Sequence, residues 1–236
     1  MSGDKQLLLG LTTTAGSNWR DKVEEIKQLA LREIALVPTT LAIADRQALY
    51  KLIEESGVES IPYIHLRDDF TIEEIDYLVS RFKTKSFSCH ADAKGYALLD
   101  RLAKYNSIIY VENFSSEEAD RLFNEESFTK HQVSGICLDL AHLEEARLTS
   151  KRHYKNLTAM LAKHPIKVNH LSGIKTGVLF KIFNKTNVDH SLDSLNDLMY
   201  LKDLAPQYFA KTIVMELENS FLEQIEIKKF LETIIA

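Results

Sequence analysis

Short apolar runs alternate with amphipathic stretches along almost the whole chain. Eight runs are rich in Ile, Val, Leu and Tyr and are too short for helices, which is typical of buried parallel strands. The predicted strands are Leu7–Thr12, Glu33–Pro38, Ser60–His65, Ser86–His90, Ser107–Glu112, Gly135–Asp139, Lys167–His170 and Thr212–Glu216.

Between these runs, apolar residues recur at helical spacing with charged residues between them. The predicted helices are Trp19–Leu31, Ala44–Ser56, Thr71–Phe82, Ala93–Tyr105, Ser116–Asn124, Tyr154–His164, Leu192–Leu204 and Phe221–Ile235. Thr71 stands before Glu73 and Glu74, and Ser115 stands before Glu117 and Glu118. A hydroxyl followed by early carboxylates is typical of a helix N-terminus.

The strand–helix unit therefore repeats about eight times, which predicts a parallel sheet. The alternative is a doubly wound open sheet, which would carry a glycine-rich turn after its first strand. The segment Gly10–Gly16 lacks that glycine spacing. We therefore predict an α/β fold in which residues 1–236 form a single (β/α)8 TIM barrel domain. The longest irregular stretch is Ser172–Asp189, and loops of that length are often functional.

The composition limits the classes of protein to which this chain can belong. The chain is 45% hydrophobic and 27% charged, as in soluble globular proteins, and it has no apolar run long enough to span a membrane. The start of the chain does not resemble a signal peptide. Cys89 and Cys137 lie in apolar runs, so we expect free buried thiols and a cytoplasmic location. The net charge of −5 provides no basic footprint for nucleic acid, and the sequence leaves the oligomeric state open.

Potential metal ligands stand where the predicted strands end. From the third strand to the eighth, the end residues are His65, His90, Glu112, Asp139, His170 and Glu216. His142 follows the sixth strand, and Asp189 and His190 follow the seventh. Strand C-termini form the active-site face of a TIM barrel, and imidazole with carboxylate is a ligand set for Zn²⁺, Mn²⁺, Mg²⁺ or Co²⁺. We expect one ion, and the number of ligands leaves room for two or three.

Other interpretations of single residues remain open. One His or Asp at a strand end is usually a hydrogen-bonded rim residue, but six consecutive strand ends are hard to explain in that way. His65 and His90 could bind substrate instead of metal. Lys175, Lys181 and Lys185 lie in the long irregular stretch, where they could bind a substrate phosphate or be solvated loop lysines.

This set of strand ends resembles the xylose isomerase-like superfamily of TIM barrels, across nearly the whole chain. The matching motifs are Val111-Glu112-Asn113, Cys137-Leu138-Asp139-Leu140-Ala141-His142, His170-Leu171-Ser172, Asp189-His190-Ser191-Leu192 and Met215-Glu216. Sugar isomerases and epimerases of this superfamily hold one divalent metal. The resemblance assigns that metal to Glu112, Asp139, His170 and Glu216. It also implies that Glu112 and Glu216 exchange protons with the substrate and that His142 contacts it.

The endonuclease IV branch, or AP endonuclease family 2, is the alternative. It uses a trinuclear zinc cluster to hydrolyse a phosphodiester in DNA. Its additional ligands are matched by His65, His90, His142, Asp189 and His190. The chain departs from this branch at Ser172-Gly173, where an Asp is usual, and in its short loops. We therefore expect a metal-dependent isomerase or epimerase of a small sugar or sugar phosphate, with a phosphodiesterase as the alternative and a non-enzymatic barrel as a third hypothesis.

Overall fold

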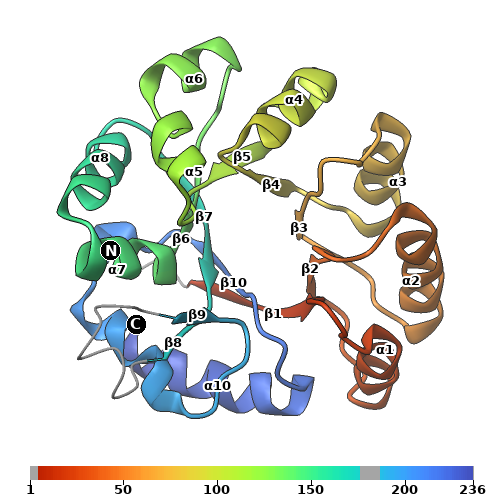
Figure 1. Ribbon diagram of the computed structural model, residues 1–236. Coiled ribbons are helices and arrows are strands. Elements are labelled where there is room, and N and C mark those ends of the chain that lie inside the picture. Colours follow the sequence, from red (N-terminus) through yellow and green to blue (C-terminus); the bar gives the residue numbers. More distant parts are fainter. Residues whose placement is uncertain (1–4, 176–186, 236) are drawn as a thin grey trace.

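Eight parallel strands form a closed barrel at the centre of the molecule (Figure 1). The computed structural model describes residues 5–175 and 187–235. The strands are β1 (Gln6–Thr12), β2 (Ala35–Val37), β3 (Tyr63–His65), β4 (Ser86–His90), β5 (Ile109–Glu112), β6 (Ile136–Asp139), β7 (Ile166–Leu171) and β10 (Thr212–Met215). Their order around the barrel is β1-β10-β7-β6-β5-β4-β3-β2. The prediction of a (β/α)8 TIM barrel is confirmed.

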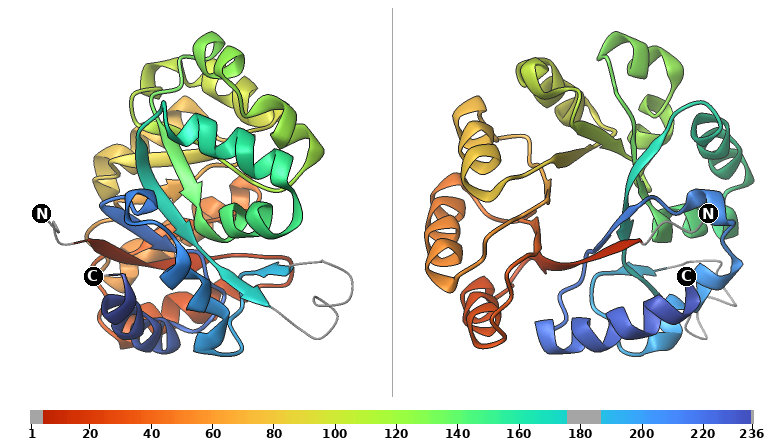
Figure 2. Two further views of the ribbon diagram at one scale, coloured as in Figure 1. Left: turned by 90° about the vertical axis from the view of Figure 1, so that its left-hand side faces the viewer. Right: turned by 180° about the vertical axis from the view of Figure 1, so that it is seen from behind.

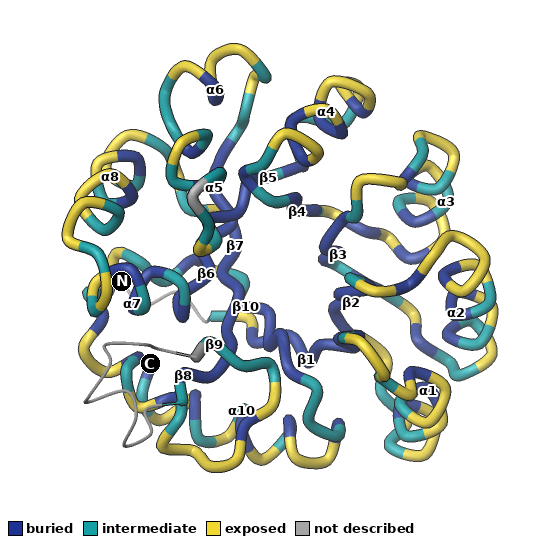
Figure 3. Tube along the Cα trace, viewed as in Figure 1, coloured by how far each residue is buried: buried dark blue, intermediate teal, exposed yellow. Residues whose placement is uncertain are grey.

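Helices surround the barrel, and their exposed residues face outward (Figures 1 and 3). The α-helices are α1 (Trp19–Gln28), α2 (Ile43–Ser56), α3 (Ile72–Phe82), α4 (Ala93–Arg101), α5 (Glu117–Leu122), α6 (Glu125–Lys130), α7 (Leu140–Thr149), α8 (Lys151–Leu161) and α10 (Phe221–Ile234). Short 3₁₀ helices are η1 (Ala103–Tyr105), η2 (Leu195–Asp203) and η3 (Pro206–Tyr208). Within the described residues, no helix has the length and apolar character needed to cross a membrane.

The apolar core has two parts because each barrel strand buries both of its faces. The larger part lies between the strands and the helices. The smaller part fills the barrel interior and consists of Leu8, Ala35, Val37, Tyr63, Cys137, Val168 and Val214, with Tyr110 packed against it. Side chains alternate along a strand, so interior residues lie two positions before the residues at the strand ends. The potential ligands therefore stand on top of a packed layer.

Residues from the two ends of the sequence close the barrel. Strand β1 pairs with β10 from Gln6–Thr212 to Leu9–Met215. Gly10 is required at this seam, because a Cβ there would lie 2.0 Å from the carbonyl oxygen of Met215. The buried side chain of Gln224 accepts from the Gly10 N–H at 2.9 Å and donates to the Gly10 carbonyl at 3.0 Å. Helix α10 is thereby fixed to the first strand.

One helix prediction is wrong in type. The stretch Leu192–Leu204 was expected to be α-helical, but it contains the 3₁₀ helix η2. Its leucines recur at every third position, at 195, 198, 201 and 204. A 3₁₀ helix has three residues per turn, so this spacing places them on one side. Leu198, Leu201 and Leu204 are buried there, whereas Leu195 at the start of the helix is exposed.

The chain also forms elements that the sequence pattern did not indicate. The stretch Ser172–Asp189, expected to be irregular, contains the antiparallel pair β8 (Gly173–Lys175) and β9 (Asn187–Asp189). The left view of Figure 2 shows the β8–β9 pair and the C-terminal end of α10 toward opposite ends of the barrel. Helix α7 begins immediately after β6, and α6 follows α5 where a single helix was expected.

Candidate metal centre

Four of the predicted ligands converge at the C-terminal ends of adjacent barrel strands. Glu112 ends β5, Asp139 ends β6, His170 lies near the end of β7, and Glu216 directly follows β10. Each offers one ligand atom, and these atoms all lie within 4.8 Å of one another. All four side chains are buried. We call this group the inner set.

The imidazole of His170 lies between two carboxylates. Its Nδ1 is 2.9 Å from an oxygen of Glu112 and 3.0 Å from an oxygen of Glu216. Burial opposes the charged imidazolium, but the surrounding groups, Glu112 and Glu216 among them, outweigh it and raise the pKa of His170 well above its usual value. Burial likewise disfavours the ionised forms of Glu112 and Glu216. Nevertheless, His170 and His65 hold the pKa of Glu112 well below its usual range. His170 and His190 lower the pKa of Glu216 to about 2.

Asp139 has a structural and an electrostatic role in the inner set. It is the N-cap of α7, because its Oδ1 accepts from the backbone N–H of His142 at 2.8 Å. Asn113 holds the Asp139 backbone by accepting from its N–H at 2.8 Å and donating to its carbonyl at 3.2 Å. Burial raises the pKa of Asp139, and Glu112 and Glu216 raise it further by repulsion between like charges. A cation at this position would relieve that repulsion.

His65 and His90 lie next to the inner set and form a second group with Glu112, again within 4.8 Å. His65 Nδ1 is 3.0 Å from Glu112 Oε2, so this carboxylate contacts both groups. The two imidazole rings lie 4.7 Å apart, and the His90 ring also stacks near Phe114 at 4.7 Å. Glu112 therefore belongs to both groups and connects them.

A hydrogen-bonded layer beneath the inner set was missed by the sequence analysis. The buried Tyr63 hydroxyl makes close contacts with His170 Nε2 and Ser88 Oγ, and it lies 3.7 Å from Cys137 Sγ. Ser88 in turn donates to Glu112 at 3.1 Å and lies 3.0 Å from His65 Nδ1. The sequence signal was available, because Tyr63, Ser88 and Cys137 each precede a strand-end ligand by two positions and so face the same interior.

The other predicted site residues lie outside these groups. His142 turns its Nδ1 to Glu145 at 3.1 Å and to Ser115 at 3.2 Å. Burial opposes its charge, but Asp139 and Glu145 raise the pKa of His142 to about 9. His190 Nδ1 lies 3.1 Å from the backbone carbonyl of Glu216 and 3.9 Å from its carboxylate. The structure therefore places both imidazoles at the border of the inner set.

The hairpin carries the remaining two predicted residues. Asp189 accepts from the Ser191 N–H at 2.8 Å and forms an ion pair with Lys175 at 3.1 Å. Lys175 also pairs with Asp193 at 2.9 Å. Lys181 and Lys185 lie outside the described residues.

Comparison with known proteins identifies the fold. No protein-family model matches this chain, and no curated protein sequence matches it. The chain is similar to the solved structure of a xylose isomerase domain protein from Alicyclobacillus acidocaldarius subsp. acidocaldarius, with a TM-score of 0.58 and 11% identity over 99% of this chain and 98% of that chain. The resemblance to xylose isomerase-like TIM barrels is confirmed at the level of the fold.

Two further solved structures align less well. N-acetylneuraminate lyase from Mycoplasma synoviae has a TM-score of 0.48 and 12% identity, over 98% of this chain and 78% of that chain. Phospho-2-dehydro-3-deoxyheptonate aldolase from Thermotoga maritima has a TM-score of 0.48 and 11% identity, over 100% of this chain and 71% of that chain.

Proposed function

We propose that this protein is a divalent-metal-dependent isomerase or epimerase that acts on a small sugar. The observation that carries the proposal is the convergence of four buried ligand side chains, Glu112, Asp139, His170 and Glu216, within 4.8 Å. They lie at the strand ends where TIM barrels hold their active sites. The fold shared with a xylose isomerase domain protein is in keeping with a sugar substrate.

The donor set of the inner group fits a divalent cation. Three carboxylates and one imidazole are buried together, and burying like charges without a cation is costly. His170 partly offsets this cost, because its protonated imidazole places a positive charge between two carboxylates. The oxygen-rich set favours Mn²⁺, Mg²⁺ or Co²⁺, and the imidazole also suits Zn²⁺. A bound divalent ion would polarise a hydroxyl or carbonyl oxygen of the substrate and acidify the neighbouring C–H bond.

Glu112 and Glu216 are the groups that would move the proton. The order β10-β7-β6-β5 places their strands on either side of β7 and β6. Their lowered pKa values keep both carboxylates ionised at neutral pH, as a general base requires. In an epimerisation, one carboxylate removes the carbon-bound proton and the other returns a proton to the opposite face. In an isomerisation, the proton is returned to the neighbouring carbon.

Solvent exchange tests this proposal. A panel of free aldoses and ketoses is incubated with the Mn²⁺-supplemented protein in D₂O, and deuterium incorporation at carbon is followed by NMR. We expect at least one sugar to gain deuterium, with a loss of at least about 100-fold in Glu112→Gln and in Glu216→Gln. The control is Glu226→Gln, which changes an exposed glutamate on α10. Full activity in the Glu112→Gln/Glu216→Gln double variant would refute the proposal.

The second group favours one other candidate, an endonuclease IV-like phosphodiesterase. His65, His90 and Glu112 could hold a second ion beside the first, and paired ions stabilise both oxygens of a phosphoryl displacement. DNA would be the substrate only in this case. This candidate requires two or three ions per chain and cleavage of a duplex that contains an abasic site. A single ion per chain by elemental analysis would exclude it.

A further inference from the structure

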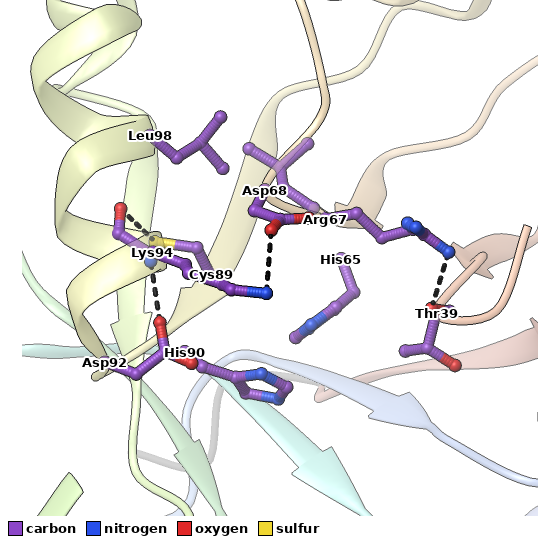
Figure 4. A pocket seen from close by; sticks show the side chains of 11 residues that line it. Thr39, His65, Arg67, Asp68, Cys89, His90, Asp92, Lys94 and Leu98 are labelled. Carbon is purple, nitrogen blue, oxygen red and sulfur yellow. Dashed lines mark hydrogen bonds and ion pairs between the residues drawn. The ribbon is translucent and has the colours of Figure 1, made fainter. Parts of the chain in front are cut away.

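A cavity of about 240 Å³ opens beside the inner set, at the ends of β3 and β4 (Figure 4). Its polar lining comes from the last residues of β3 and β4, from the loops after β2, β3 and β4, and from the start of α4. It consists of Thr39, His65, Arg67, Asp68, His90, Asp92 and Lys94. His65 connects the cavity to the inner set through its 3.0 Å contact with Glu112. Pockets for drug-sized ligands begin at about 300 Å³, so this cavity suits a small molecule or one end of it.

The two histidines supply hydrogen-bonding groups that the protein does not use. His65 employs Nδ1 toward Ser88 and Glu112, while its Nε2 makes no hydrogen bond to a described residue. The His90 side chain makes no hydrogen bond within residues 5–175 and 187–235. Figure 4 shows both rings facing the space beside Arg67 and the Lys94–Asp68 pair. With both nitrogens unused, a neutral His90 imidazole offers a hydroxyl group one donor and one acceptor, and His65 adds its Nε2 alone.

The charges that line the cavity cancel. Lys94 pairs with Asp68 at 3.3 Å. Arg67 is held by Asp69 at 3.3 Å and by the Thr39 carbonyl at 3.2 Å. Asp92 accepts from the Gly95 N–H at 2.7 Å as the N-cap of α4. A phosphate, with a charge of roughly −1.5 to −2, would meet two carboxylates here and would have to break existing ion pairs.

Lys175, which the sequence suggested as a phosphate ligand, already forms ion pairs within the protein. Asp189 and Asp193 hold its ammonium at 3.1 and 2.9 Å. Neither the cavity nor this lysine therefore provides an excess of positive charge. Hydroxyl groups can instead donate to Asp68 or Asp92 and accept from Arg67 or Lys94 without a change in net charge.

We infer that the cavity binds the neutral, polyhydroxylated end of the substrate, away from the reacting carbon. The substrate is then a free sugar rather than a sugar phosphate. The assignment of a reacting end rests on the proposed function. The preference of the cavity for neutral hydroxyls over phosphate can be measured without catalysis, so the two proposals can fail separately.

The test is calorimetric binding of sorbitol, sorbitol 6-phosphate and inorganic phosphate to the Mn²⁺-supplemented chain. We expect saturable sorbitol binding, with sorbitol 6-phosphate at least about tenfold weaker because of its charge. His90→Phe keeps the ring packing but removes the nitrogens, and Arg67→Met removes the guanidinium. Each should weaken sorbitol binding about tenfold while Mn²⁺ affinity is unchanged. The control His131→Phe changes the histidine that directly follows α6 and pairs with Asp100, and it should have no effect.

Three results would overturn the inference. They are the absence of saturable sorbitol binding, tighter binding of sorbitol 6-phosphate or inorganic phosphate, and a second bound Mn²⁺ that is lost in His90→Phe. If Mn²⁺ does not bind but sorbitol does, with the expected loss in both variants, the metal-dependent function fails and the cavity assignment stands.

Discussion

At the scale of single residues, the inner set depends on how His170 is held. Glu112 and Glu216 contact its Nδ1, and Tyr63 contacts its Nε2 from below. A ligand histidine needs its second nitrogen fixed, because that contact sets the tautomer and the direction of the first nitrogen. If His170 binds a metal as proposed, Tyr63 is therefore expected to act as its positioning residue.

Tyr63→Phe tests this positioning role. The substitution keeps the buried ring but removes the hydroxyl that contacts His170 and Ser88. We expect Mn²⁺ affinity, measured by calorimetry, to fall about 10- to 100-fold. Tyr110→Phe is the matched control, since the Tyr110 hydroxyl makes no hydrogen bond to a described residue. Equal Mn²⁺ affinities in the two variants would show that Tyr63 serves packing alone.

The raised pKa of His170 predicts that metal binding releases protons. A metal binds only the neutral imidazole, so below this pKa each ion must displace a proton. The apparent affinity should therefore rise with pH, by about tenfold per pH unit for each proton released. Calorimetry in buffers of different ionisation enthalpy should count about one proton per ion. Affinity that does not change between about pH 6 and 8 would contradict this account.

At the scale of elements, strand ends and helix starts share residues. Asp139 ends β6, caps α7 and belongs to the inner set, so one short segment both turns the chain and presents a proposed metal ligand. Asp92 similarly caps α4 beside the cavity. Such residues connect the stability of a helix with the chemistry of the site.

Asp139→Asn and Asp139→Ala separate these two roles. Asn caps a helix about as well as Asp, so the metal-free Asn variant should lie within about 1 kcal/mol of the original protein in urea unfolding. The Ala variant should lose about 1 kcal/mol more, because the His142 N–H loses its acceptor. Both should bind Mn²⁺ at least about 100-fold more weakly. Equal stability of the two variants would argue against the capping role.

Two ion pairs join α2 to α3 at very different depths. Arg46 is fully buried, binds Glu74 at 2.7 Å and Asp69 at 2.8 Å, and donates to the Leu41 carbonyl. Arg81 pairs with Glu54 at 2.6 Å near the surface. Arg46→Met should lower the free energy of unfolding by about 3 to 5 kcal/mol, since it leaves the buried Glu74 carboxylate without an opposite charge and with only the Tyr50 hydroxyl as a donor. Arg81→Met should lower the free energy of unfolding by less than about 1 kcal/mol. Similar losses in urea unfolding would contradict the role of burial.

At the scale of the whole molecule, the sequence was sufficient for the barrel and for the inner set. Eight buried strands leave a strong apolar pattern, and a parallel barrel must bring their C-terminal ends together. The strand pattern therefore predicted that six strand-end residues converge, and the resemblance to xylose isomerase-like barrels singled out Glu112, Asp139, His170 and Glu216 among them. The metal role of these residues stays a prediction.

Other features depend on contacts that no local pattern encodes. The β8–β9 pair, for example, packs against η2 and α7, which come from other parts of the chain. The position of Lys175 depends on where Asp189 and Asp193 lie after folding. The cavity is lined by residues from three different β/α units, and the cancellation of its charges can be seen only when their side chains are considered together.

Mn²⁺ titration of the metal-free protein, combined with elemental analysis, tests the central claim most directly. The account predicts one ion per chain, held by the inner set, with affinity at least about 100-fold lower in Glu216→Gln. It also predicts a rise in thermal stability of the original protein with Mn²⁺ concentration that is absent in this variant. Failure to bind Mn²⁺, Zn²⁺, Mg²⁺ or Co²⁺ in stoichiometric amounts, or binding unaffected by Glu216→Gln, would contradict it.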